Sequence, residues 1–155
     1  MLNKYLHQFS TCTATNLRAR LLPHKPIMLL CVIDLIEAGF IISNKIELSE
    51  MLEERFKSNW KRYVKTDSVY KPAVGTPFWH LNYEPFWHLV PFEDGNEQIM
   101  ALQKSNPYSL NLMRKHIKYA VIDKDLFDLL QDETPRKCLI EVLIKSIESN
   151  NKVVF

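Results

Sequence analysis

The longest apolar stretch of the chain follows Pro26 and contains few polar residues before Gly39. Proline is common in the first turn of a helix, and glycine is common just past the last turn. The pattern therefore predicts a helix over residues 25–38. Because its apolar residues lie nearly all the way round, we expect this helix to be buried on most sides and to form the centre of the core.

Helical spacing of apolar residues returns in several later segments. Ser49 can cap a helix over residues 50–65, and Thr134 can cap a closing helix over residues 134–148 that has Pro135 in its first turn. Shorter helices are expected over residues 99–103 and 108–116, and from Asp123 or Asp125 to Leu130. The side chains expected to point inward from the helix at 50–65 are Met51, Leu52, Phe56, Trp60 and Tyr63. Those expected on one side of the closing helix are Leu139, Val142, Leu143 and Ile147.

The string Pro-Phe-Trp-His-Leu occurs twice, at residues 77–81 and 85–89. Prolines and Gly75 exclude a long helix in this region, and aromatic residues favour strands. We therefore expect a β-hairpin whose strands, 76–81 and 84–89, are joined at Asn82 and Tyr83. The alternation of a strand would point Phe78 and His80 to one face, and Trp79 and Leu81 to the other.

These elements together predict an α+β fold, mostly helical, with a small antiparallel hairpin or sheet. A chain of 155 residues with 46% hydrophobic residues can form one core, so we expect a single domain over residues 1–155. The apolar run at residues 27–33 is too short to span a membrane, and the start of the chain lacks the pattern of a signal peptide. The three cysteines are widely spaced and predict neither disulfides nor a zinc site. A cytoplasmic protein without a cofactor is expected.

Positive charge is distributed unevenly, although the formal net charge is only +2. No acidic residue precedes Asp34, while basic residues gather in the segments 4–25, 55–71 and 104–124. Such clustering is typical of nucleic-acid-binding surfaces, and each run taken alone is equally compatible with a solvated face.

The order of these motifs resembles the sulfur-binding domain family over residues 17–147. The residues that carry the resemblance are Pro23-His24-Lys25-Pro26 before an aliphatic helix, the Leu48-Ser49 helix start, the two Phe-Trp-His-Leu strings and the Leu-Leu-x-Asp-x-x-x-Arg pattern at 129–136. In relatives this domain usually precedes a nuclease of the HNH type, and it recognises DNA in which sulfur replaces a non-bridging phosphate oxygen. The resemblance implies a module of bacterial restriction and defence that binds phosphorothioate-modified double-stranded DNA.

The resemblance also implies roles for individual residues. His24 and Lys25 match the polar pair at the modified phosphate, and Pro77 matches the proline whose ring forms the floor of the sulfur pocket. Thr76 stands where the family commonly has an aromatic residue, and His80 where it commonly has a small one. Tyr70 is then expected to supply the missing aromatic wall. Further phosphate contacts are expected from Arg18, Arg20, Lys61, Arg62 and Lys71, and base contacts from the loop with Gln103, Lys104 and Ser105.

The chemistry of the modified group explains why these residue types are suitable. Sulfur is larger and more polarisable than oxygen and is a poorer hydrogen-bond acceptor, so an apolar wall suits it. A normal phosphate oxygen against the same wall would lose its hydrogen bonds to water, which costs about 1–3 kcal/mol. That cost corresponds to roughly a tenfold to hundredfold preference for sulfur.

Other functions remain open from the residues alone. The chain could be a winged-helix regulator that binds unmodified DNA, or a protein-interaction module that uses the aromatic hairpin, and a homodimer is compatible with each. An enzyme is not expected, because neither an HNH nor a PD-(D/E)xK nuclease pattern is present, and three glycines do not form a phosphate-binding loop. Cleavage would need a separate nuclease domain or subunit. A metal site at His80 and His88 is not expected, since no third ligand has suitable spacing.

Overall fold

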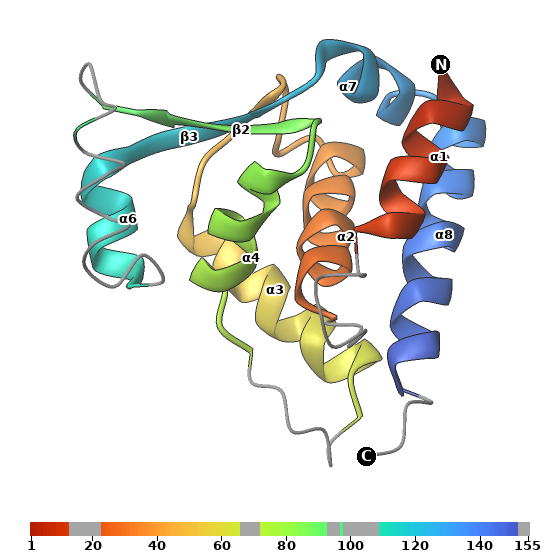
Figure 1. The fold of residues 1–155 in the computed structure, drawn as a ribbon, viewed down its shortest axis with the longest axis horizontal. Coiled ribbons are helices and arrows are strands. Elements are labelled where there is room, and N and C mark those ends of the chain that lie inside the picture. Colours follow the sequence, from red (N-terminus) through yellow and green to blue (C-terminus); the bar gives the residue numbers. More distant parts are fainter. Residues whose placement is uncertain (13–22, 66–71, 93–96, 98–108, 152–155) are drawn as a thin grey trace.

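The structure is a computed structural model that describes residues 1–12, 23–65, 72–92, 97 and 109–151 (Figure 1). Its helices are α1 (Leu2–Thr11), α2 (His24–Glu37), α3 (Glu50–Tyr63), α4 (Gly75–His80), the 3-10 helix η1 (Leu81–Tyr83), α6 (Leu110–His116), α7 (Lys124–Leu130) and α8 (Glu133–Asn151). Its strands are β1 (Lys45–Ile46), β2 (Trp87–Pro91) and β3 (Ile117–Ile122). The predicted α+β class, mostly helical with a small antiparallel sheet, is confirmed.

Helix α2 is the centre of the core, as its unbroken apolar sequence predicts. It packs against α3 and α4 on one side and against α8 on the other, and α1 covers α8 (Figure 1). Within α2 only His24, Asp34 and Glu37 are partly or fully accessible. Gly39 has a φ of 82°, a left-handed conformation that favours glycine, and it ends the helix as expected. In the part of the chain that the structure describes, no helix is long and apolar enough to cross a membrane.

The capping prediction for α3 is confirmed, because the backbone N–H of Leu52 donates to the Ser49 hydroxyl oxygen over 3.1 Å. Leu52, Phe56 and Trp60 are buried, at intervals of four residues that form one stripe of the helix. Tyr63 is only partly buried. The prediction for Met51 is wrong, since this side chain lies beside the stripe and is 45% exposed.

The remaining helices agree with the sequence pattern in most respects. Helix α7 begins after Asp123 and ends at Leu130 as predicted, and α8 buries Leu139, Leu143 and Ile147, with Val142 partly buried. Asp132, rather than Thr134, accepts at the start of α8, because the N–H of Thr134 donates to its carboxylate. Helix α6 confirms the later part of the helix predicted over 108–116. The helix predicted over 99–103 lies outside the described residues.

The predicted hairpin is wrong. The first copy of the repeated string forms α4 and η1, and only the second copy enters a strand, β2. Pro77 lies in the first turn of α4, where its fixed φ is suitable and its missing N–H costs nothing. The predicted alternation of side chains is therefore also wrong, and Phe78, Trp79 and Leu81 are all buried.

The sheet has the order β1-β3-β2, with both pairings antiparallel. Strand β3 is central and was not predicted from the sequence, although Ile117, Ala120 and Ile122 are buried within it. Strand β2 pairs with β3 over the register from Trp87↔Ile122 to Pro91↔Ile117. The sheet lies across one end of the helical layer, so the start of α2 and the end of α3 point away from it (Figure 1).

Candidate nucleic-acid interface

The start of α2 lies beside the end of α3. The ring of His24, in the first turn of α2, contacts the ring of Trp60, with their centroids 4.8 Å apart and their planes tilted by 49°. Trp60 is itself buried and packs on Phe56, so it is a rigid support for the histidine. His24 stays partly accessible. The contact fixes a candidate phosphate ligand next to the last turn of α3.

That last turn carries exposed positive charge. Lys61 and Arg62 lie in it, and Lys65 follows two residues after its end. Among the described residues, Lys61 and Lys65 form no ion pair with a carboxylate, unlike Lys57, which pairs with Glu53 in the middle of the helix. The Arg62 guanidinium lies 5.2 Å from the ring centroid of Tyr63. We call His24, Lys61, Arg62 and Lys65 the basic end.

The polarity of α2 adds to this positive potential. A helix of 14 residues has a partial positive charge at its N-terminus, where the first N–H groups lack partners within the helix. The first turn of α2 contains no acidic residue, and its N-cap residue is Pro23, whose side chain cannot accept a hydrogen bond. Pro26 has no N–H, and the N–H of Ile27 donates to the Pro23 carbonyl oxygen. An anion at the basic end would therefore meet at most the backbone N–H groups of His24 and Lys25, as well as side-chain cations.

Lys25 does not lie open at this surface, contrary to what the resemblance implies. Its ammonium group lies 2.7 Å from the Glu84 carboxylate, and the two side chains are only 10% and 17% exposed. An ammonium group in so buried a place needs a carboxylate partner, because an unpaired buried charge is strongly destabilising. A phosphate could reach Lys25 only by competing with Glu84.

Helix α4 carries Thr76, Pro77 and His80. It packs against α2, and the pKa of His80 is lowered first by burial and then by the positive charge of Lys25. Both effects favour the neutral form of His80, which can take part in a hydrogen bond to a phosphate.

The turn that contains Pro77 is only partly accessible. Pro77 is buried, whereas the neighbouring Thr76 is partly exposed. Pro77 and His80 are three residues apart and lie on the same side of α4. A pocket floor needs a ring face that a ligand can reach, so the role of Pro77 remains a prediction that the burial in this structure does not favour.

The other predicted ligands fall on segments that are not described. Arg18, Arg20, Tyr70, Lys71, Gln103, Lys104 and Ser105 all lie outside the described residues. The ion pair of Lys25 with Glu84 was not predicted from the sequence, because 59 residues separate the two and no local pattern connects them.

Cysteine and histidine side chains elsewhere in the molecule do not form a reactive or metal-binding site in the part of the chain that the structure describes. Burial raises the pKa of Cys12 and of Cys31 to about 12, so both thiols remain protonated and are poor nucleophiles. His88 is exposed on β2, with Nε2 3.8 Å from the Asp123 carboxylate, and it is not paired with His80 across a hairpin. Within the described ranges, no three His, Cys, Asp or Glu residues are grouped so that they could hold a metal ion.

The basic end thus combines a partly accessible histidine, a helix N-terminus and lysines that have no carboxylate partner among the described residues, and α4 packs against the same helix α2. Such a set can bind the phosphate backbone of a nucleic acid. Neither a protein-family model nor a curated protein matches this chain.

Proposed function

We propose that this chain binds double-stranded DNA through the basic end. The observation that carries the proposal is the contact of His24 with Trp60, which places the positive end of α2 against the cationic last turn of α3. Phosphates approach such a surface under electrostatic attraction, and Lys and Arg contacts then hold the backbone without reading the sequence. The predicted ligands of segments 13–22 and 66–71 adjoin these helices in the sequence.

We further propose that the DNA it selects carries a phosphorothioate. The support is the resemblance of residues 23–26 and of both Phe-Trp-His-Leu strings to the sulfur-binding domain, together with the packing of α4 against α2. In this proposal His24 meets the charged oxygen of the modified phosphate. Because Pro77 is buried, the sulfur would contact the partly exposed side chain of Thr76 in the same turn of α4. We propose that any cleavage of bound DNA is carried out by a separate nuclease domain or subunit.

The ion pair of Lys25 with Glu84 changes the role proposed for this lysine. While the pair is intact, the carboxylate neutralises the ammonium group, so Lys25 adds little attraction for ordinary phosphates. His24 is then the member of the Pro-His-Lys-Pro motif that contacts the phosphate directly.

The proposal is tested by fluorescence anisotropy with three duplexes of one sequence, which carry a single Rp phosphorothioate, the Sp isomer, or no sulfur. We expect the protein to bind one isomer roughly tenfold to a hundredfold more tightly than the unmodified duplex, the preference that the cost of an unbonded oxygen predicts. His24→Ala should weaken binding of the preferred duplex. His88→Ala, at an exposed histidine on β2, should not.

Two other outcomes of this experiment would favour the other candidate functions. Equal and specific binding of all three duplexes would contradict sulfur recognition and favour a DNA-binding regulator. Binding that is weak for every duplex and is abolished by moderate salt would contradict DNA recognition altogether and favour a protein-interaction module.

A further inference from the structure

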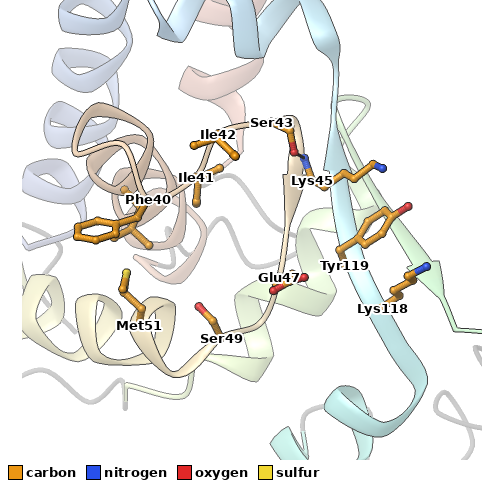
Figure 2. A pocket seen from close by; sticks show the side chains of 11 residues that line it. Phe40, Ile41, Ile42, Ser43, Lys45, Glu47, Ser49, Met51, Lys118 and Tyr119 are labelled. Atoms are coloured by element: carbon orange, nitrogen blue, oxygen red, sulfur yellow. Dashed lines mark hydrogen bonds between the residues drawn. The ribbon is translucent and has the colours of Figure 1, made fainter.

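A hollow of about 440 Å³ lies beside β1 (Figure 2). None of the residues that line it belongs to the basic end. The loop after α2, the first turn of α3, and strands β1 and β3 line it. Three large apolar side chains at this hollow are open to solvent: Phe40 is 62% exposed, Ile42 is 84% exposed and Met51 is 45% exposed. A cluster of exposed apolar side chains with a polar rim is typical of a protein interaction site.

Strand β1 lies at the edge of the sheet, and its outer side faces this hollow (Figure 2). The carbonyl oxygen of Asn44 accepts from the N–H of Ile122 over 3.0 Å, so the backbone groups of residue 44 point towards β3. Backbone direction alternates along an antiparallel strand, so the backbone groups of Lys45 and Glu47 point away from β3. The N–H of Lys45 donates to the Ser43 hydroxyl oxygen over 3.4 Å, so that, among the described residues, its outward C=O and the outward groups of Glu47 can pair with another strand.

The opposite edge of the sheet, at β2, is covered, in contrast to the edge at β1. On β2 the N–H of Leu89 donates to the side-chain oxygen of Asn82 in η1 over 3.1 Å, and Pro91 has no N–H to offer. The sheet thus has one covered edge and one edge beside an apolar hollow.

The polar side of the hollow has an excess of positive charge. The ammonium groups of Lys45 and Lys118 lie 5.4 and 5.7 Å from the ring centroid of Tyr119. Neither lysine forms an ion pair with a carboxylate of the described residues, and the only acidic residue among those that line the hollow is Glu47. An acidic ligand would find two available cations here.

We propose that this hollow binds an extended acidic segment of a partner protein, which adds to the sheet as a fourth strand along β1. Side chains of an added strand alternate between two faces. Those on the face of Ile46 would meet the apolar wall at Ile42 and Met51, and those on the other face would meet Lys45 and Lys118. The expected ligand is therefore a segment in which acidic and bulky apolar residues alternate.

A second copy of the chain is a less suitable occupant. Its own β1 lies in the same recess, so pairing two such strands would bring two concave surfaces together and leave both hollows unfilled. A single extended segment fills the hollow and reaches the edge at the same time. This proposal does not depend on DNA binding.

The test uses labelled peptides of about ten residues, long enough to cover a short strand. One alternates Glu with Val, a second has the same composition with the Glu residues grouped in one half, and a third alternates Lys with Val. Fluorescence anisotropy should show binding of the first peptide in preference to the other two. Equal binding of all three would overturn the proposal.

Variants then locate the binding site. Ile42→Ser with Met51→Ser should weaken binding of the alternating Glu peptide by about tenfold or more, because contacts with two apolar side chains are lost. Phe92→Ser, at an exposed aromatic residue outside the hollow, should not change it. The Ile42 and Met51 pair carries no charge and should leave duplex binding unchanged, which separates failure of this proposal from failure of the DNA proposal.

The backbone hydrogen bond between Glu47 and the added strand can be tested separately. Glu47→Pro removes the outward N–H, so it should weaken peptide binding more than Glu47→Ala does. In the unaltered protein, hydrogen exchange of the Glu47 amide should slow when the peptide is added, a measurement that does not depend on how the variants fold. Unchanged exchange at saturation, or a dimer that forms through this edge instead, would overturn the proposal.

Discussion

Replacing both Lys61 and Arg62 by glutamate should lower the affinity for a DNA duplex by about 10- to 100-fold at moderate salt, because two phosphate contacts are lost and repulsion is added. The slope of log affinity against log salt should fall by about two, one for each lost contact. Modified and unmodified duplexes should lose affinity alike, since these residues contact the backbone and do not read the sulfur. Anisotropy titrations at several salt concentrations measure both quantities.

A matched control carries the same change in charge at the other end of the molecule. Lys4 near the start of α1 and Lys124 at the start of α7 are exposed. Helix α7 and the N-terminal end of α1 lie at the end of the molecule opposite to the last turn of α3 (Figure 1). Lys4→Glu with Lys124→Glu should reduce affinity only slightly, through the change in net charge. If the two double variants lose affinity equally, attraction is a property of total charge and the basic end is not the binding surface.

Trp87→Ala should destabilise the fold by about 3–5 kcal/mol, the usual cost of removing a large buried aromatic side chain. Trp87 is fully buried, its ring meets the Phe78 ring edge-on at 5.4 Å, and its Nε1–H donates to the Phe78 carbonyl oxygen over 3.1 Å. In a chain of this size such a loss lowers the melting temperature by roughly 10 °C. Thermal unfolding followed by circular dichroism measures it.

Trp87→Phe separates the ring from the hydrogen bond. It keeps an aromatic side chain but leaves the Phe78 carbonyl without its donor, so we expect a smaller loss of about 1–3 kcal/mol. Because Trp87 joins β2 to α4, both variants should also loosen the helix that carries Thr76 and Pro77. A Trp87→Ala protein within 1 kcal/mol of the unaltered protein would contradict this description of the core.

The repeated string shows what local sequence can and cannot predict. Its two copies do pack together, as a hairpin would require, but Phe78 lies on a helix and Trp87 on a strand. Both copies begin with a proline, Pro77 and Pro85, so the proline does not distinguish them. The second copy differs in that it pairs with β3. Strand pairing is a long-range property, and neither β1 nor β3 was predicted from the sequence.

The elements that were predicted correctly are those whose signals are local. The boundaries of α2 follow from Pro26 and Gly39, and the start of α3 follows from the Ser49 cap. The candidate site depends on contacts between distant residues, which explains why it could be predicted only in part. His24 is partly accessible, and Lys25 is paired with Glu84, which no spacing or motif indicates.

The most direct test of the central claim is a map of the DNA-binding surface by nuclear magnetic resonance. Amide chemical shifts of the ¹⁵N-labelled protein would be followed while a duplex is added. We expect the largest changes at His24, over residues 60–65 and at Thr76, with little change in α7. If the largest changes fall on α7, or on the hollow beside β1, DNA does not bind at the basic end and the proposed function is contradicted.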